Sequence, residues 1–161
     1  MTTVRPAVET DLVAIAELGS KAFSGLNPPT LGESWVRACW SAHPRMLYWV
    51  AEDRKEIRGY ILWVEKGGFR KEAVLELEQI AVDAAFRRKG IGTTLVRESL
   101  KGLRSILHDR GSSLKLIEVT TGTEQGAVDF YRRTLGAELV ARLPDVFRGD
   151  EIVLFARPPR A

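Results

Sequence analysis

The chain has 161 residues, of which 45% are hydrophobic and 28% charged, and its formal net charge is +3. Such values are typical of a globular protein and argue against intrinsic disorder, so we expect one domain over residues 1–161 with a core of its own. The single cysteine, Cys39, excludes an internal disulfide and a cysteine zinc site, so we expect a cytoplasmic protein without a metal. No apolar run is long enough to span a membrane, and we expect neither export nor membrane insertion.

Taken in chain order, the first half is predicted to contain a strand over 3–6, a helix over about 10–23, a loop over 24–31, a helix over about 32–42 and a hairpin of 47–52 with 57–65. The second half is predicted to contain a central strand over 73–82, a helix over 93 to about 110, a strand over 114–120, a helix over 123–134 and strands over 137–143 and 151–156. This order, with one parallel crossover, predicts an α/β (mixed α+β) fold: one mixed, mostly antiparallel sheet with helices on both faces. An exposed edge strand near the carboxyl terminus would permit a homodimer.

The most informative stretch runs from Val74 to Val96. A strand ending in Ile80-Ala81-Val82 leads into the loop Arg87-Arg88-Lys89-Gly90-Ile91-Gly92, and a helix opens at Thr93. Glycines let a ligand approach the backbone closely, and the amides of a first helical turn have no partner inside the helix. The helix dipole and three cationic side chains add positive charge, so the loop predicts a phosphate or pyrophosphate site.

Spacing excludes the two familiar phosphate loops. A Walker loop has four residues between its glycines where this chain has one, and the dinucleotide fingerprint has a third glycine where Leu95 stands. The remaining pattern, Arg87-x-x-Gly90-x-Gly92 behind a strand, resembles the acetyl-coenzyme A loop of the GNAT N-acetyltransferases. The resemblance implies a GNAT-like fold along nearly the whole chain, and acetyl-CoA as co-substrate with its pyrophosphate on the loop amides. The coenzyme site that it implies consists of Ile80, Ala81, Val82, Arg87, Arg88, Lys89, Gly90, Ile91, Gly92, Thr93, Glu124 and Gln125, with a backbone amide near residues 80–82 as oxyanion donor.

Three glutamates are candidates for the base that deprotonates an acceptor amine. Glu76 and Glu78 leave the same face of the central strand, about 6.6 Å apart along it, and partial burial would raise a carboxylate pKa there. Glu76 matches the position of the catalytic glutamate in the histone-acetylating branch of the family. The segment around Glu118 resembles the one that holds this residue in the ribosomal-protein N-terminal acetyltransferases. Any of the three alone could be a solvated strand residue, and the preferred order is Glu118, Glu76, Glu78.

Tyr131 is the candidate acid. With Ala127, Phe130 and Leu135 it shares one helical face, and the segment from Phe130 resembles the family's tyrosine motif, in which this phenol protonates the departing thiolate. The chain departs from the family at Glu124, where asparagine is usual; Gln125 beside it could substitute in contacting the pantetheine arm.

Together these residues predict an acyltransferase that moves an acetyl group from acetyl-CoA to a primary amine of a small molecule, peptide or protein by direct attack in a ternary complex. A longer acyl group is a second enzyme hypothesis. The alternative outside catalysis is a GNAT-like module that senses coenzyme A or binds nucleic acid. Nucleic acid is not the expected partner, because no basic run exceeds the three residues of the loop.

Overall fold

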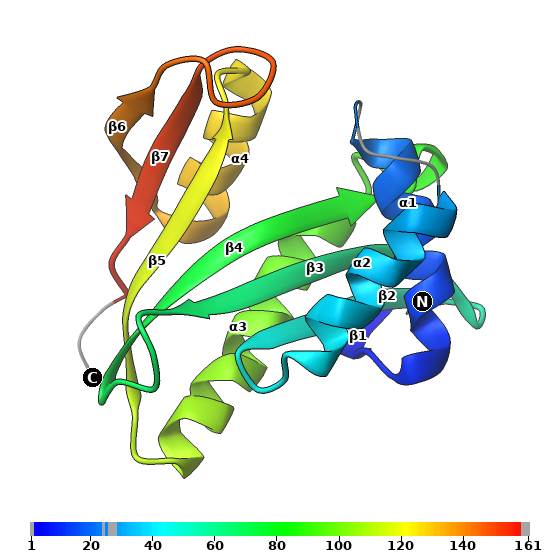
Figure 1. The fold of residues 1–161 in the computed structure, drawn as a ribbon, viewed down its shortest axis with the longest axis horizontal. Coiled ribbons are helices and arrows are strands. Elements are labelled where there is room, and N and C mark those ends of the chain that lie inside the picture. The colour runs from blue at the N-terminus through cyan, green and yellow to red at the C-terminus, as the bar shows by residue number, and fades with distance from the viewer. Residues whose placement is uncertain (1, 24, 26–28, 159–161) are drawn as a thin grey trace. The chain divides into compact units, whose positions relative to one another are not determined.

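The structure is a computed structural model that describes residues 2–23, 25 and 29–158 (Figure 1). Its elements are β1 (Thr3–Pro6), α1 (Leu12–Ala22), α2 (Pro29–Ser41), β2 (Met46–Asp53), β3 (Glu56–Lys66), β4 (Glu72–Val82), α3 (Ile91–Asp109), β5 (Ser113–Gly122), α4 (Gln125–Leu135), β6 (Glu138–Leu143) and β7 (Glu151–Ala156), with short 3₁₀ turns at Glu9–Asp11 and Ala84–Phe86. None of the helices in the described part of the chain is long and apolar enough to cross a membrane.

The strands follow the order β1-β2-β3-β4-β5-β7-β6. The β4–β5 pair is parallel, whereas β1–β2, β2–β3, β5–β7 and β6–β7 are antiparallel. Parallel neighbours need a long crossover, and α3 supplies it between β4 and β5. The mixed, mostly antiparallel sheet confirms the predicted fold class.

The chain forms two compact units, one made of the residues up to Val64 with Gln79–Leu103, the other of Glu65–Glu78 with the residues from Arg104 onward. In the first unit, helices cover both faces of the strands (Figure 1). Leu12 and Ile15 of α1 and Cys39 of α2 pack in one cluster with alternate residues of β2 and β3. On the opposite face, the indole nitrogen of Trp63 donates to the hydroxyl of Ser99 in α3 at 2.9 Å. Period-two alternation in β2 and β3 therefore supplies two apolar faces.

Three local features of the first unit differ from the sequence prediction. The hairpin turn is only Arg54-Lys55, both with positive φ (52° and 65°), because a two-residue turn of this handedness matches the strand twist. The second helix begins at Pro29 rather than 32, since proline fits a first helical turn whose amides lack partners anyway. The third helix begins at Ile91 rather than Thr93. Of the predicted loop 24–31, residues 24 and 26–28 lie outside the described residues.

In the second unit, α4 lies beside β5 and buries Val128 and Tyr131 (Figure 1). The helix ends at Gly136, whose φ of 65° is left-handed and whose amide donates to the carbonyl of Arg132 at 3.0 Å. This end turns the chain into β6, the outermost strand in the order, which pairs with β7.

Candidate active site

The predicted anion loop connects β4 to α3 in the first unit. The amide of Asp83 donates to the carbonyl of Arg58 at 2.8 Å, and the Asp83 carboxylate accepts from the amide of Ala85 at 3.0 Å. These bonds shape the 3₁₀ turn that precedes the exposed segment from Arg87 to Gly90. Gly90 has a φ of 79°, and a β-carbon there would meet no atom within 4 Å, so the backbone at this glycine faces open space.

The backbone amides of residues 88–93 are the groups of this loop that would bind an anion. Among the described residues none of these six amides has a hydrogen-bond partner; the first to have one is that of Thr94, which donates to the carbonyl of Gly90 at 3.0 Å. Successive unpaired amides at the amino end of a 19-residue helix are hydrogen-bond donors that coincide with the positive end of the helix dipole. The side chains of Arg87 and Lys89 donate to loop carbonyls at 3.4 and 3.1 Å.

The candidate bases lie in the second unit. Glu76 is the register partner of Glu118 in the β4–β5 ladder, so their side chains share a face. The Nζ of Lys66 lies 2.9 Å from Oε1 of Glu118 and 3.3 Å from Oε2 of Glu76. Burial by itself would lower the pKa of Lys66, but the hydrogen bond that Lys66 donates to Glu118 and the charge of Glu76 outweigh burial and raise it. Lys66 therefore stays an ammonium that neutralises part of this carboxylate cluster.

Glu78 differs from the other two candidates. Its side chain makes no hydrogen bond or ion pair with another described residue. Glu78 is an exposed residue of β4, yet desolvation of its carboxyl raises its pKa, the charge of Glu76 raises it further, and Lys66 opposes both. A carboxylate with a raised pKa and unpaired oxygens is chemically the better proton acceptor, while the choice among the three glutamates stays a prediction.

The β4–β5 ladder ends at the pair of Glu76 and Glu118. Beyond it, β4 runs on to Val82 and β5 to Gly122 without further register partners between them. The predicted oxyanion donor, an amide within residues 80–82, belongs to the part of β4 that is not paired with β5. Which amide could serve stays a prediction.

Tyr131 is 8% exposed, and burial raises its pKa to about 12. Its ring packs edge-on against Phe130 at 5.2 Å between centroids, although Phe130 itself is only half-buried. The hydroxyl has no hydrogen-bond partner among the described residues, yet it is not one of their fully buried unpaired atoms. The ring is thus fixed by packing while the hydroxyl keeps some access to solvent.

Glu124 and Gln125, expected to contact the coenzyme arm, lie at the amino end of α4. The Glu124 side chain folds over Gly122, where a β-carbon would stand 2.4 Å from its Oε2. The side-chain Nε2 of Gln125 donates to Asp129 at 2.7 Å, which leaves its carbonyl oxygen and one N–H to replace the usual asparagine. Burial and then the charge of Glu124 raise the pKa of Glu151. This corner of the second unit is acidic.

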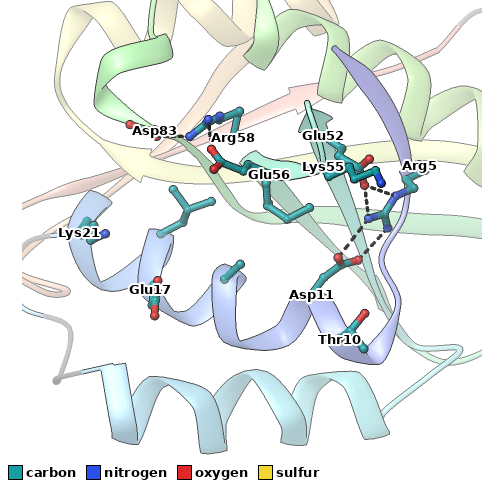
Figure 2. Close-up of a pocket in the computed structure, with 13 residues that line it drawn as sticks. Arg5, Thr10, Asp11, Glu17, Lys21, Glu52, Lys55, Glu56, Arg58 and Asp83 are labelled. Carbon is teal, nitrogen blue, oxygen red and sulfur yellow. Dashed lines mark hydrogen bonds and ion pairs between the residues drawn. The ribbon is translucent and has the colours of Figure 1, made fainter. Parts of the chain in front are cut away.

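Figure 2 shows a pocket of about 580 Å³ in the first unit, lined by α1 and the β2–β3 hairpin. Arg5 lies between two carboxylates, with 2.7 Å from Nη1 to Oδ2 of Asp11 and 2.6 Å from Nη2 to Oε2 of Glu52. Burial alone would raise the pKa of Asp11, but hydrogen bonds from Arg5 and from the amide of Val8 hold it below its usual value. Because this buried charge is already paired, the network has a structural role.

Sequence reasoning missed two residues of these sites, Lys66 and Arg58. Lys66 is 52 residues from Glu118, and it reaches that carboxylate from β3 across β4, which lies between β3 and β5 in the sheet. Arg58 carries no signature of its own in the sequence, yet it contacts the anion loop.

The model of the acetyltransferase (GNAT) family matches residues 12–137. A curated relative, an uncharacterised N-acetyltransferase of Methanocaldococcus jannaschii, is 29% identical over 147 residues, which cover 84% of this chain. The chain spans 60% of the length of that relative.

Solved structures resemble the chain in fold. The ribosomal-protein-S18-alanine N-acetyltransferase of Escherichia coli superposes with a TM-score of 0.77 at 17% identity, covering 100% of this chain and 96% of that one. NAA60 of Arabidopsis thaliana in complex with acetyl-CoA gives a TM-score of 0.77 at 15% identity and covers 98% of each chain.

Proposed function

The chain belongs to the acetyltransferase (GNAT) family, and on that premise we propose that it is an acyltransferase that uses acetyl-CoA to acetylate a primary amine. The observation that carries the proposal is the row of six amides without partners, residues 88–93, with open space above Gly90. Such a row suits the pyrophosphate of a coenzyme better than any neutral ligand. The family and enzyme class match what the loop predicts.

The residues of the loop fit coenzyme A by their chemistry. Backbone donors would hold the pyrophosphate, and Arg88, exposed and without an ion pair among the described residues, adds a charge that suits a polyanion. The same fold binds acetyl-CoA in the Arabidopsis NAA60 structure, which supports acetyl-CoA as the co-substrate here. A thioester supplies an acyl carbon that is open to attack by an amine.

In the proposed reaction a neutral amine attacks the thioester carbonyl, a C–N bond forms, and the C–S bond breaks in a ternary complex. The amine loses one proton. Glu78 is best suited to accept it, because Glu76 and Glu118 are ion-paired with Lys66. An α-amine of pKa about 7.7–8.0 needs less help from a base than a lysine of pKa about 10.4.

The role of Tyr131 is narrower than the sequence motif suggests. With a pKa of about 12, the phenol is protonated over the whole working range, but full proton transfer to a thiolate whose conjugate acid resembles cysteine, pKa about 8.5, is uphill. We assign Tyr131 the donation of a hydrogen bond to the developing thiolate, which then takes its proton from solvent.

Glu33, Asp145, Asp150 and Glu151 are the acidic residues that could attract a cationic acceptor. Two of them, Glu33 and Asp150, are ion-paired within the chain, to Arg37 and Arg142. The Escherichia coli neighbour is named for an alanine of a ribosomal protein, so peptides with a free α-amine are the first acceptors to screen, with small polyamines beside them. The runner-up function, a module that binds coenzyme A without catalysis, is favoured by Glu124 alone.

The test is a thermal melt with and without acetyl-CoA, followed by the acceptor screen with release of free thiol as the readout. At 100 times Kd, binding adds about 2.7 kcal/mol, which moves the midpoint by several degrees. Gly90→Glu should abolish the shift. Gly68→Glu is the matched control, because Gly68 also has positive φ (85°) and open space around it but lies in the β3–β4 turn.

No shift at millimolar acetyl-CoA would contradict the transferase. A shift without thiol release on any amine would instead support the binding module.

A further inference from the structure

Arg58 of β3 reaches the anion loop from the strand beside it. Its backbone carbonyl accepts from the amide of Asp83 at 2.8 Å, and its Nη1 lies 3.5 Å from Oδ2 of the same aspartate (Figure 2). Asp83 in turn caps the 3₁₀ turn through the amide of Ala85. Main chain and side chain of one residue therefore both hold the first residue of the loop.

The same guanidinium also contacts the middle of the loop. Its Cζ lies 4.3 Å from the centroid of the Phe86 ring, and the Nζ of Lys89 lies 4.7 Å from that centroid. Phe86 is half-buried and ends the 3₁₀ turn directly before Arg87. A cation over an aromatic face is attracted by the ring quadrupole, so Arg58 and Lys89 restrain the ring.

This position is costly for Arg58. Its Nη2 is ion-paired with Glu56, whereas its Nε is fully buried and has no hydrogen-bond partner among the described residues. An unpaired buried donor lowers stability, and such groups persist where the surrounding contacts determine them. The guanidinium is thus held at the loop in spite of one unsatisfied N–H, which stability alone does not explain.

We propose that Arg58 is a positioning residue for coenzyme binding: through Asp83 and Phe86 it holds the loop in the conformation in which the amides of residues 88–93 are free for the pyrophosphate. The coenzyme part of this inference rests on the proposed function. The inference goes beyond it, because Arg58 donates nothing to the coenzyme itself. Its effect belongs in the affinity for acetyl-CoA and not in the rate at saturation.

The first experiment measures Kd for acetyl-CoA by calorimetry, with KM and kcat, in the wild type, Arg58→Met, Arg58→Lys and Phe86→Leu. Arg58→Met keeps an apolar stem and removes the cation, and we expect Kd and KM to rise roughly fivefold to tenfold with kcat unchanged. Arg58→Lys should recover part of the loss, because an ammonium can still lie over Phe86 but cannot bridge Glu56 and Asp83. The double variant Arg58→Met/Phe86→Leu should lose less than the sum of the single losses, since Arg58 acts through the ring.

Arg45→Met is the matched control: Arg45 is exposed in the turn before β2 and has no ion pair within the described part of the chain. It should leave Kd unchanged. If Arg58→Met does not fold, Phe86→Leu carries the test alone. Wild-type affinity in that variant, or additive losses in the double variant, would overturn the proposal.

A second readout needs no coenzyme. Trypsin cleaves after arginine and lysine, and Arg87, Arg88 and Lys89 of the loop are exposed. A loop that lacks the contacts of Arg58 should be cleaved faster in the coenzyme-free protein. If the wild type does not bind acetyl-CoA, the proposed function and the role in coenzyme affinity fail together, while faster cleavage of Arg58→Met still establishes that Arg58 orders the loop. Unchanged cleavage together with unchanged Kd overturns the inference and leaves the proposed function intact.

Discussion

Lys66 at the end of β3 donates a hydrogen bond of 2.9 Å to Glu118 in the middle of β5, and so joins two residues 52 positions apart. The same ammonium is 3.3 Å from Glu76, the register partner of Glu118. One cation is thereby ion-paired with two of the three carboxylates that could serve as base. The third, Glu78, has a raised pKa.

The first prediction concerns that cation. Lys66 lowers the pKa of Glu78, so Lys66→Met should raise this pKa further and move the rising limb of kcat/KM against pH to higher pH. Lys115→Met is the control, because Lys115 of β5 pairs with Glu72 of β4 at 3.2 Å and is not among the charges that shift the pKa of Glu78. A limb that stays in place would show that Glu78 is not the titrating base.

Glu78→Gln should lower the rate of acetyl transfer and slightly stabilise the fold at neutral pH. The folded-state pKa of Glu78 is raised, so its protonated form is favoured in the native protein, and ionisation above that pKa costs stability. The melting midpoint of Glu78→Gln should therefore exceed that of the wild type by about 1 °C at pH 7, with the difference vanishing below the unfolded-state pKa. Full activity in this variant would return the role of base to Glu76 or Glu118.

Tyr131→Phe should reduce kcat about tenfold to a hundredfold, the cost of one hydrogen-bond donor to a developing anion. Stability should hardly change, because the hydroxyl has no partner among the described residues and only the ring is buried. The loss should be the same from roughly pH 6 to 10, since a phenol of pKa about 12 remains protonated throughout. A loss confined to high pH would mean that the phenol ionises during the reaction.

Gly102→Ala should destabilise the protein although alanine is the better helix former. A β-carbon at Gly102 would stand 2.1 Å from Cη2 of Trp49, so helix α3 approaches β2 closely only because the residue is glycine. We expect a loss of about 1–3 kcal/mol in the free energy of unfolding, measured by denaturant titration. Trp49→Leu in the same chain should relieve most of the clash.

Gly126→Ala should change the free energy of unfolding in the opposite direction. Gly126 lies in α4 with no atom within 4 Å of a β-carbon, so the substitution should stabilise by about 0.5–1 kcal/mol. A stabilised Gly102→Ala would contradict the packing seen at Trp49, and a destabilised Gly126→Ala would contradict the open surroundings of Gly126.

Much of the fold was predictable because its signals are local. Periodicity placed every strand and helix from β1 to β7 in the right order, and Gly111 and Gly136 mark helix ends at which φ is positive. Element boundaries were less accurate: α3 starts two residues before Thr93, because hydrogen bonding along the chain, not side-chain chemistry, sets where a helix begins. The single domain over residues 1–161, the homodimer and the site assignments stay predictions.

The amino-acid sequence by itself predicted the anion loop and identified the family to which the chain belongs. Glycine positions, cationic side chains and a helix start are properties of neighbouring residues, and they need no distant contact to be recognised. Only the tertiary structure decided which glutamate is free, why Gly102 is a glycine and that Arg58 touches the loop. Each of these depends on strand register or helix packing, which bring together side chains far apart in the chain, and burial then sets their charge.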